Sequence, residues 1–327
     1  MGDYEKQYGW GLIGPGRFAR EFAEELGDVE RARLVAVASR SQERAESFAR
    51  DFGFERTYTS YEDLIDDSDV DIVYIVLPHV FHRDVAEKAL AAGKAVVCEK
   101  PLTPSSRETG ALIEFAKEKG AFLMEAMKTG FLPAVRLARD WIEQGAIGEV
   151  RLAKADFCFQ GPDDPSDRLM NPELAGGAVL DVGIYPLYLV RFLLGEVEKV
   201  SSFGALASTG VEDSAAILTA HTSGASSALT CSFRTAEHMD AVILGTDGEI
   251  RIPTFHAAKT VELYKDGFLY EQEEFPDCGM VRPEIEAVMR SLDEGKVESQ
   301  LHSHKDTLRL AEIMDEVRDQ LGAKRPE

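Results

Sequence analysis

Short apolar runs alternate with helical patterns through the first third of the chain. Five apolar runs are typical of buried strands: Gly9–Ile13, Leu34–Ala38, Ile72–Leu77, Ala95–Cys98 and Ala121–Ala126. Between them, apolar residues recur at helical spacing, as from Phe18 to Leu26, and each helical stretch stops at a glycine. The run Ile72–Leu77 is apolar throughout, as expected of a strand buried on both faces. This alternation predicts an α/β fold with a doubly wound parallel sheet.

After about residue 148 the pattern changes, and strand candidates follow one another. These candidates are Val150–Phe159, Val200–Leu206, Ala215–His221, Ser226–Phe233 and Ala241–Leu244. Hairpin turns are expected at Thr246–Gly248 and Lys265–Gly267, and two helices, Pro283–Glu294 and His304–Leu321, end the chain. We therefore predict two domains, residues 1–127 and 128–327, the second built on a large, mostly antiparallel mixed sheet.

Composition narrows the classes of partner. The chain has 327 residues, and 58 acidic against 36 basic side chains give a formal net charge of −22. Nucleic acid and anionic membranes need a basic surface, so neither is expected as a partner. We expect no secretory signal and no membrane-spanning run. The four cysteines are far apart, which predicts neither a disulfide framework nor a zinc site. A cytoplasmic protein without a bound metal is therefore expected.

The sequence from Gly14 to Ala19 follows the first predicted strand and opens the first helix. In this G-x-G-x-x-A pattern, Gly14 permits a tight turn, Gly16 leaves room for a pyrophosphate, and Ala19 allows close helix–strand packing. The helix N-terminus adds N–H donors and the positive end of its dipole. In its strand–turn–helix context, the pattern predicts that residues 1–127 bind a dinucleotide. The alternative is a purely structural β–α turn.

The end of the second predicted strand indicates which dinucleotide binds. NAD sites usually place a carboxylate there, ~20 residues after the turn, on the ribose 2′-hydroxyl. Here Ser39 and Arg40 occupy that place and Arg44 follows. With Arg17 and Arg20 they suit a 2′-phosphate, which arginine binds through two parallel hydrogen bonds. We predict that NADP is preferred over NAD; the alternative is that these are ordinary surface arginines.

Four separated motifs resemble the Gfo/Idh/MocA oxidoreductase family. They are the glycine turn, the run LPHVFH at Leu77–His82, the segment AAGKAVVCEKP ending at Pro101, and the run LDVGIYP at Leu180–Pro186. The resemblance covers essentially the whole chain. It is strongest to the branch of dimeric dihydrodiol dehydrogenase, NADP-dependent D-xylose dehydrogenase and glucose–fructose oxidoreductase. It implies an NADP-dependent enzyme acting on CH–OH groups of a sugar, polyol or cyclic diol, and a homodimer formed through the second domain's sheet.

The resemblance also implies that Lys100 reaches the substrate hydroxyl and the nicotinamide ribose from the carboxyl end of a parallel strand. Asp181 and Tyr185 lie four residues apart, so on a helix they share a face. Hydride transfer from a carbinol carbon needs a group that takes the hydroxyl proton. A tyrosine hydroxyl, with a pKa of about 10, does so only beside a cation. We predict Lys100 and Tyr185 as the catalytic pair and Asp181 as an orienting third member. The alternative is a packed Tyr185 with Asp181 as a helix cap.

We predict cofactor contacts from residues of four segments. They are Gly14, Gly16, Arg17, Phe18, Ala19, Ser39, Arg40, Arg44, Leu77, Pro78, His82, Glu99 and Lys100. His82 is expected to line the pocket, whereas His79 equally suits a structural role. Further pocket candidates are Asp156, Phe157, Phe159 and Arg168.

Two residues depart from the family branch. Lys128 and Gly130 stand where relatives often carry an aromatic residue and an arginine, a change expected to open or recharge the pocket. The substrate therefore stays unnamed, although a neutral one suits so acidic a chain. One alternative is a catalytically silent dinucleotide-binding sensor, which the retained Lys100 and Tyr185 disfavour. The other is an NAD-dependent inositol-type dehydrogenase, which Tyr185 and the Ser39-Arg40 pair disfavour.

Overall fold

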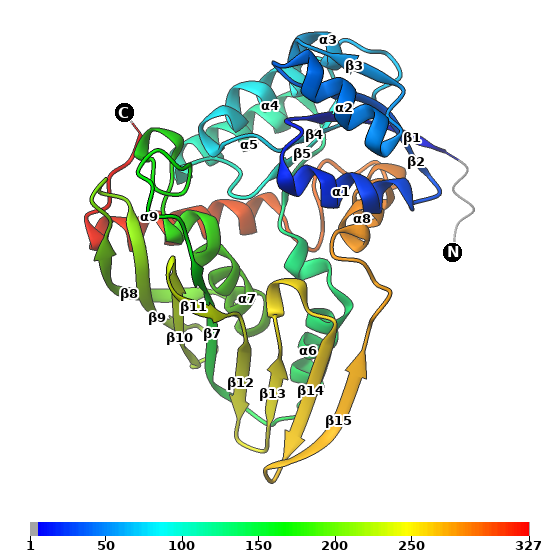
Figure 1. Cartoon of the computed structure of the whole chain (residues 1–327). Helices are drawn as coiled ribbons and strands as arrows, with labels where there is room; N and C mark the ends of the chain where they lie inside the picture. Colours follow the sequence, from blue (N-terminus) through cyan, green and yellow to red (C-terminus); the bar gives the residue numbers. More distant parts are fainter. Residues whose placement is uncertain (1–5, 327) are drawn as a thin grey trace. The chain divides into compact units, whose positions relative to one another are not determined.

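The computed structural model describes residues 6–326, which form two compact units (Figure 1). The first unit combines the chain up to Met127 with Val281–Leu308. The second combines Lys128–Met280 with the chain from Arg309 onward. The expected boundary after residue 127 coincides with the change between units. The segment Val281–Leu308, however, packs with the first unit and not with the second domain to which the sequence assigned it.

One ion pair and two further hydrogen bonds join this later segment to the rest of the first unit. Its helix α8 (Arg282–Asp293) ends in Asp293, which accepts hydrogen bonds from Arg31 at 2.8 Å and from the Tyr8 hydroxyl at 2.9 Å. At its other end, the N–H of Val281 donates to Glu25 at 2.8 Å. Residues more than 250 positions apart in sequence make these contacts, so no local pattern predicts them.

The first unit contains a six-stranded parallel sheet in the order β3-β2-β1-β4-β5-β6. Its strands are β1 (Tyr8–Ile13), β2 (Ala32–Ala38), β3 (Arg56–Tyr58), β4 (Ile72–Ile75), β5 (Ala95–Glu99) and β6 (Leu123–Ala126). The connecting helices are α1 (Arg17–Gly27), α2 (Gln42–Phe52), α3 (Tyr61–Ile65), α4 (His82–Ala91) and α5 (Ser106–Lys119). The five predicted strands are confirmed, as is the parallel, doubly wound arrangement. The extra strand β3 is only three residues long and half-buried, so it lacks the apolar pattern of the others.

The strand order reverses at β1, which lies between β2 and β4. In doubly wound sheets, ligands bind beyond the carboxyl ends of the strands at this reversal. The glycine turn leaves β1 at that edge, and Lys100 leaves β5 at the same edge. The two segments are therefore brought to one side of the unit by the parallel direction of the strands.

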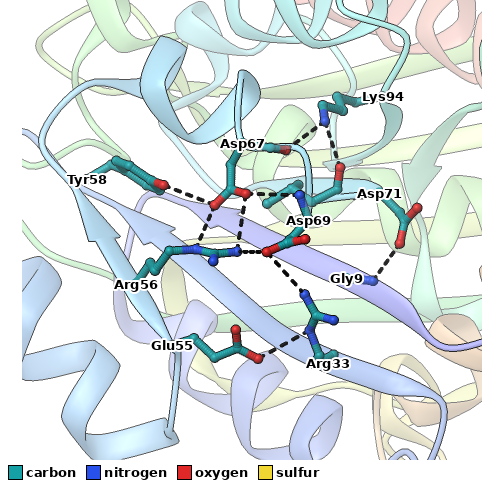
Figure 2. Close-up of polar contacts among 10 residues, drawn as sticks. Gly9, Arg33, Glu55, Arg56, Tyr58, Asp67, Asp69, Asp71 and Lys94 are labelled. Carbon is teal, nitrogen blue, oxygen red and sulfur yellow. Dashed lines mark hydrogen bonds and ion pairs between the residues drawn. The ribbon is translucent and has the colours of Figure 1, made fainter.

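A polar network closes the opposite, amino-terminal edge of this sheet (Figure 2). Asp67 accepts a hydrogen bond from the Tyr58 hydroxyl at 3.0 Å and pairs with Arg56 at 2.8 Å. Asp69 pairs with Arg56 at 2.8 Å and with Arg33 at 3.7 Å. Asp67 and Asp69 precede β4, and Arg33 and Arg56 lie at the starts of β2 and β3, so these four residues lie at the edge away from the glycine turn. Tyr58, which ends β3, reaches the network through its hydroxyl group.

The second unit contains a nine-stranded sheet in the order β15-β14-β13-β12-β7-β10-β9-β8, with β11 paired to β7. Its strands are β7 (Val150–Gln160), β8 (Val197–Leu206), β9 (Glu212–His221), β10 (Ser226–Ser232), β11 (Arg234–His238), β12 (Ala241–Gly245), β13 (Glu249–Ile252), β14 (Thr260–Lys265) and β15 (Phe268–Glu274). Strands β7 and β10 are parallel, and the other described pairs are antiparallel. The two predicted turns join β12 to β13 and β14 to β15. A mostly antiparallel mixed sheet is thus confirmed.

Helix α7 (Ile184–Leu194) packs against β7, β10 and helix α6 (Pro133–Glu143) of the same unit. The helical stretch Pro172–Leu194 is long and apolar enough to cross a membrane by composition alone, which the sequence analysis did not anticipate. However, 89% of its most apolar window is buried inside the unit, as in the core helix of a globular domain. Helix α9 (His304–Leu321) begins in the first unit and continues in the second.

Candidate active site

The turn after β1 brings backbone from three strands together. Gly14 has a φ of +97°, and its N–H donates to the carbonyl of Ala38, at the end of β2, at 3.1 Å. A β-carbon on Gly14 would lie 2.6 Å from the carbonyl oxygen of Val76, just after β4. Glycine suits this position because it adopts a positive φ without strain and has no β-carbon to clash with Val76.

Gly16 lies at the same turn but borders open space. A β-carbon there would meet nothing closer than the Gly14 carbonyl oxygen at 3.9 Å, and the residue is exposed. Gly16 precedes α1, and no side chain caps this helix start. Within the first turn of α1, Phe18 is half-buried and Ala19 is fully buried. An uncapped helix start with room beside it fits the pyrophosphate of a dinucleotide.

The end of β2 offers a hydroxyl and exposed guanidinium groups. Ser39 is buried, and its Oγ accepts a hydrogen bond from the N–H of Ser41 at 3.2 Å. Arg40 and Arg44 are exposed on either side of the start of α2. The first carboxylate after β2 is Glu43, inside α2.

The arginines of α1 differ from each other. Arg17 is exposed at the first position of the helix, as a phosphate contact requires. Arg20 instead pairs with Asp51 at 2.9 Å, and its guanidinium carbon lies 4.9 Å from the centre of the Phe52 ring. Arg20 therefore links α1 to α2, and of the four arginines suggested by the sequence we keep Arg17, Arg40 and Arg44 as candidates for phosphate contacts.

His82 lies fully buried at the start of α4, between the loops that follow β4 and β5. Its Nδ1 is 3.0 Å from the Pro101 carbonyl oxygen, and its Nε2 is 2.8 Å from that of Leu77. Burial lowers the pKa of His82, while these carbonyl contacts act in the opposite direction. His79 is also buried, its ring 5.8 Å from that of His82, and Pro78 precedes it. His82 thus holds two loops together, a role that the sequence did not indicate.

Glu99 ends β5 and is buried, accepting a hydrogen bond from the Tyr74 hydroxyl at 2.6 Å. The Tyr74 ring stacks on Phe22 of α1, with ring centres 3.6 Å apart. Burial, together with the neighbouring Glu99 carboxylate, raises the pKa of Tyr74 well above its usual range, so its hydroxyl stays a donor. Lys100 follows at the sheet edge, half-buried, and its peptide bond to Pro101 is cis.

A buried carboxylate that the sequence analysis did not single out holds the backbone after Lys100. Glu125, on β6, accepts the N–H of Leu102 through Oε1 at 2.8 Å. Its Oε2 lies 2.6 Å from Nε2 of His302, which is also 3.0 Å from the Thr307 hydroxyl. Because His302 and Glu125 are 177 residues apart, no spacing rule relates them.

In the second unit, Asp181 lies buried in a π-helical turn, Val179–Gly183, that precedes α7. Nη1 of Arg168 donates a hydrogen bond to Asp181 Oδ1 at 3.1 Å. From the sequence, Asp181 and Tyr185 were expected to share a face if both lie on a helix. The structure instead places Asp181 in the wider π turn and Tyr185 in the first turn of α7.

Tyr185 belongs to an aromatic group. Its ring centre lies 5.2 Å from that of Phe157 and 5.9 Å from that of His256, and the last two are 4.4 Å apart. His256 follows β13 in a short turn, and no motif around it marks it as a site residue. Phe159 packs on Phe233 instead, with ring centres 5.2 Å apart.

Asp156 lies on the other face of β7 from Phe157, because neighbouring strand residues alternate. It accepts a hydrogen bond from the Thr230 hydroxyl and lies 3.3 Å from His238 Nδ1. The structure therefore separates Asp156 from the aromatic group, although the sequence placed both among the pocket candidates.

Lys128 and Gly130 are both buried. Nζ of Lys128 lies 2.8 Å from the sulfur of Met280. A β-carbon on Gly130 would lie 2.7 Å from Cζ of Tyr188, on α7. The Tyr188 ring therefore occupies the space that the sequence analysis expected the glycine to open.

The two units correspond to two known family models. The model of the oxidoreductase family with an NAD-binding Rossmann fold matches residues 8–127. The model of the GFO/IDH/MocA C-terminal domain matches residues 135–251.

Named proteins match the chain over nearly its whole length. It is 34% identical over 333 residues to trans-1,2-dihydrobenzene-1,2-diol dehydrogenase of Mus musculus, covering 97% of this chain and 98% of the relative. It is 33% identical over 326 residues to scyllo-inositol 2-dehydrogenase (NADP(+)) of Bacillus subtilis (strain 168), covering 96% and 97%. The structure of a 3-ketoreductase from Actinomadura kijaniata in complex with NADP and TDP-benzene aligns with a TM-score of 0.85 and 28% identity, covering 97% of this chain and 98% of that one.

Proposed function

The chain belongs to the Gfo/Idh/MocA oxidoreductases, and we propose that it is an NADP-dependent dehydrogenase or reductase of a neutral sugar, polyol or cyclic diol. The observation that carries this proposal is the position of Lys100 at the sheet edge where the open glycine turn begins. A cation beside a nicotinamide cofactor is what carbinol–carbonyl chemistry needs. Two relatives are named for cyclic compounds with neighbouring hydroxyl groups, which supports this substrate class.

The residues after β2 support NADP as the preferred cofactor. Ser39 and Arg40 replace the carboxylate that would bind a ribose 2′-hydroxyl and would repel a 2′-phosphate. Arg40, Arg44 and Arg17 are exposed, so their guanidinium groups are accessible to a phosphate. NADP also appears in the name of the Bacillus relative and in the complex of the 3-ketoreductase.

When bound, NADP supplies the nicotinamide that accepts a hydride from a carbinol carbon or gives one to a carbonyl carbon. In the oxidation, the deprotonated oxygen of Tyr185 takes the proton of the substrate hydroxyl, and in the reduction the Tyr185 hydroxyl donates that proton to the substrate oxygen. Lys100 is the cation that this role of Tyr185 requires, since a positive charge beside a tyrosine favours its deprotonated form. Asp181, hydrogen-bonded to Arg168, orients the substrate hydroxyl.

Initial-rate assays with NADP and NAD test the proposal on inositols, cyclic diols, pentoses and hexoses. We expect turnover with NADP, and Lys100→Met to abolish it while NADP still raises the melting temperature. Lys119→Met, a change at an exposed end of α5, is the matched control. Unchanged turnover in Lys100→Met would contradict the proposed mechanism. NADP binding by the wild type without turnover of any compound would favour a dinucleotide-binding sensor.

The cofactor preference has its own test. Arg40→Ala should weaken NADP binding by about tenfold or more and leave NAD binding nearly unchanged, since one charge-assisted phosphate contact is lost. Arg50→Ala, an exposed arginine in the last turn of α2, is the control. Equal or better use of NAD by the wild type contradicts an NADP preference.

A cytoplasmic homodimer formed through the large sheet is part of this proposal. Phe203 of β8 and Leu218 of β9 are 74% and 55% exposed in the single chain. Phe203 lies opposite Ala216, two residues from Leu218, so both project from one face. The four cysteines are free thiols, as a reducing compartment maintains them. A monomer at micromolar concentration in light scattering contradicts the dimer.

A further inference from the structure

A buried ion pair within the second unit joins two residues that have so far been assigned no role. Glu212, the first residue of β9, and Arg318, on α9, are 0% and 1% exposed. Glu212 Oε1 lies 3.6 Å from Arg318 Nε. Such a pair gains little stability, because the loss of hydration offsets the attraction between the charges. The contacts that Glu212 makes with its neighbours indicate a role other than stability for this ion pair.

The Glu212 carboxylate contacts the start of the turn that carries Asp181. Its Oε1 accepts the N–H of Val179 at 3.3 Å, and Val179 is the first residue of the π turn. The turn continues directly into α7, where Tyr185 lies. A carboxylate at a helix start pairs with its N–H groups and with the positive end of its dipole. One side chain thus joins Arg318 to the segment that bears both predicted site residues.

Gly176 and Gly177, which precede this turn, leave space that a larger side chain would fill. Gly177 has a φ of +122°, and a β-carbon on it would lie 2.6 Å from Cδ of Glu212. A β-carbon on Gly176 would lie 2.6 Å from the carbonyl oxygen of Arg168. The missing side chain of Gly177 therefore leaves space for the Glu212 carboxylate. The missing side chain of Gly176 leaves space for the backbone of Arg168, whose side chain pairs with Asp181.

We propose that Glu212 and Arg318 are positioning residues for Asp181 and Tyr185. Arg318 fixes the Glu212 carboxylate, and the carboxylate fixes the turn through the Val179 N–H. Both side chains are buried, so they act through the turn and not on the substrate. The consequence for catalysis rests on the proposed function, whereas the positioning itself is measurable without turnover.

Arg318→Met, compared with Arg309→Met, tests the proposal in the full-length protein. Arg309 lies on the same helix and pairs with Glu196 at 2.7 Å, so the control also removes an ion-paired arginine from α9. Hydrogen exchange followed by mass spectrometry should report faster exchange over residues 177–190 in Arg318→Met only. We expect kcat to fall by about 10- to 100-fold there, as for misplaced catalytic groups, with the KM for NADP unchanged.

Two further variants complete the test. Glu212→Gln keeps an acceptor for the Val179 N–H but removes the charge that Arg318 attracts, and we expect the same changes in exchange and kcat. It replaces Arg318→Met if that variant fails to fold. Arg318→Lys should recover most of the lost kcat because it restores the positive charge.

Wild-type exchange over 177–190 and wild-type kcat in Arg318→Met or Glu212→Gln would overturn the proposal. Equal effects of Arg318→Met and Arg309→Met would overturn it as well, since they would reflect general destabilisation. If the wild type turns over no substrate, the proposed function fails, and the exchange data alone decide the positioning role.

Discussion

Arg168 donates a hydrogen bond from Nη1 to Oδ1 of Asp181 at 3.1 Å, and the arginine side chain is 49% exposed while that of the aspartate is 9% exposed. Asp181 thus has a cationic partner, Arg168, within its own unit, and the sequence analysis did not pair these two residues. Arg168→Met should lower kcat/KM by about tenfold, or roughly 1.4 kcal/mol of transition-state free energy, because the carboxylate loses its orienting contact. Initial rates at saturating NADP measure this.

The control for Arg168 is Arg151→Met. Arg151 forms an exposed pair with Glu149 at the start of β7, in the same unit. Exposed pairs contribute little, so this variant should keep wild-type rates. Equal rates for both variants would show that Arg168 does not orient Asp181 for the reaction.

Gly16→Ala should weaken NADP binding without lowering the stability of the free protein. A β-carbon there meets only the Gly14 carbonyl oxygen, at 3.9 Å, so the melting temperature of the free protein should stay within about 2 °C of the wild type. The methyl group would occupy the space that a pyrophosphate needs, so the dissociation constant for NADP should rise by about tenfold or more. Isothermal titration measures it, and unaltered NADP affinity would place the pyrophosphate elsewhere.

Gly130→Ala should destabilise the second unit. The added methyl would overlap the Tyr188 ring, with 2.7 Å to Cζ, and such overpacking costs about 1–3 kcal/mol. Gly27→Ala is the control, because nothing lies within 4 Å of a β-carbon at that helical position and alanine favours a helix. Thermal unfolding should show a lower melting temperature for Gly130→Ala and an equal or higher one for Gly27→Ala.

The network around Asp67 predicts a loss of stability in acid (Figure 2). Burial alone would raise the pKa of Asp67, but hydrogen bonds from the Asp69 N–H and the Tyr58 hydroxyl, with Arg56 beside it, hold that pKa below its usual range. A carboxyl whose pKa is lowered by folding stabilises the protein above its unfolded pKa of about 3.9. This contribution disappears as the pH falls through the folded value.

Asp67→Asn should therefore have a lower melting temperature than the wild type at pH 7, and the difference should shrink below about pH 4. Asp277→Asn, at an exposed position, should behave like the wild type at every pH. Melting curves from pH 7 to pH 3 provide the measurement. A constant difference across this range would mean that the charge of Asp67 does not contribute.

Much of the first unit follows from local patterns in the sequence. The run Ile72–Leu77, the turn at Gly14 and the helix that follows it are all present, because burial periodicity and backbone freedom are properties of neighbouring residues. The position of Lys100 at the sheet edge also follows, since parallel strands bring their carboxyl ends together. The mixed sheet of the second unit was predictable for the same reason, from its turns and alternating strands.

The fold class, the family and the segments of the candidate site could therefore be predicted from local patterns along the chain. Three contacts became visible only in the folded chain: Glu125 with His302, Glu212 with Arg318, and His256 with Tyr185. The folded chain also places α8 with the first unit. These contacts join residues far apart in the chain. They depend on how whole helices and strands pack against one another, and the spacing of residues along the sequence does not predict that packing.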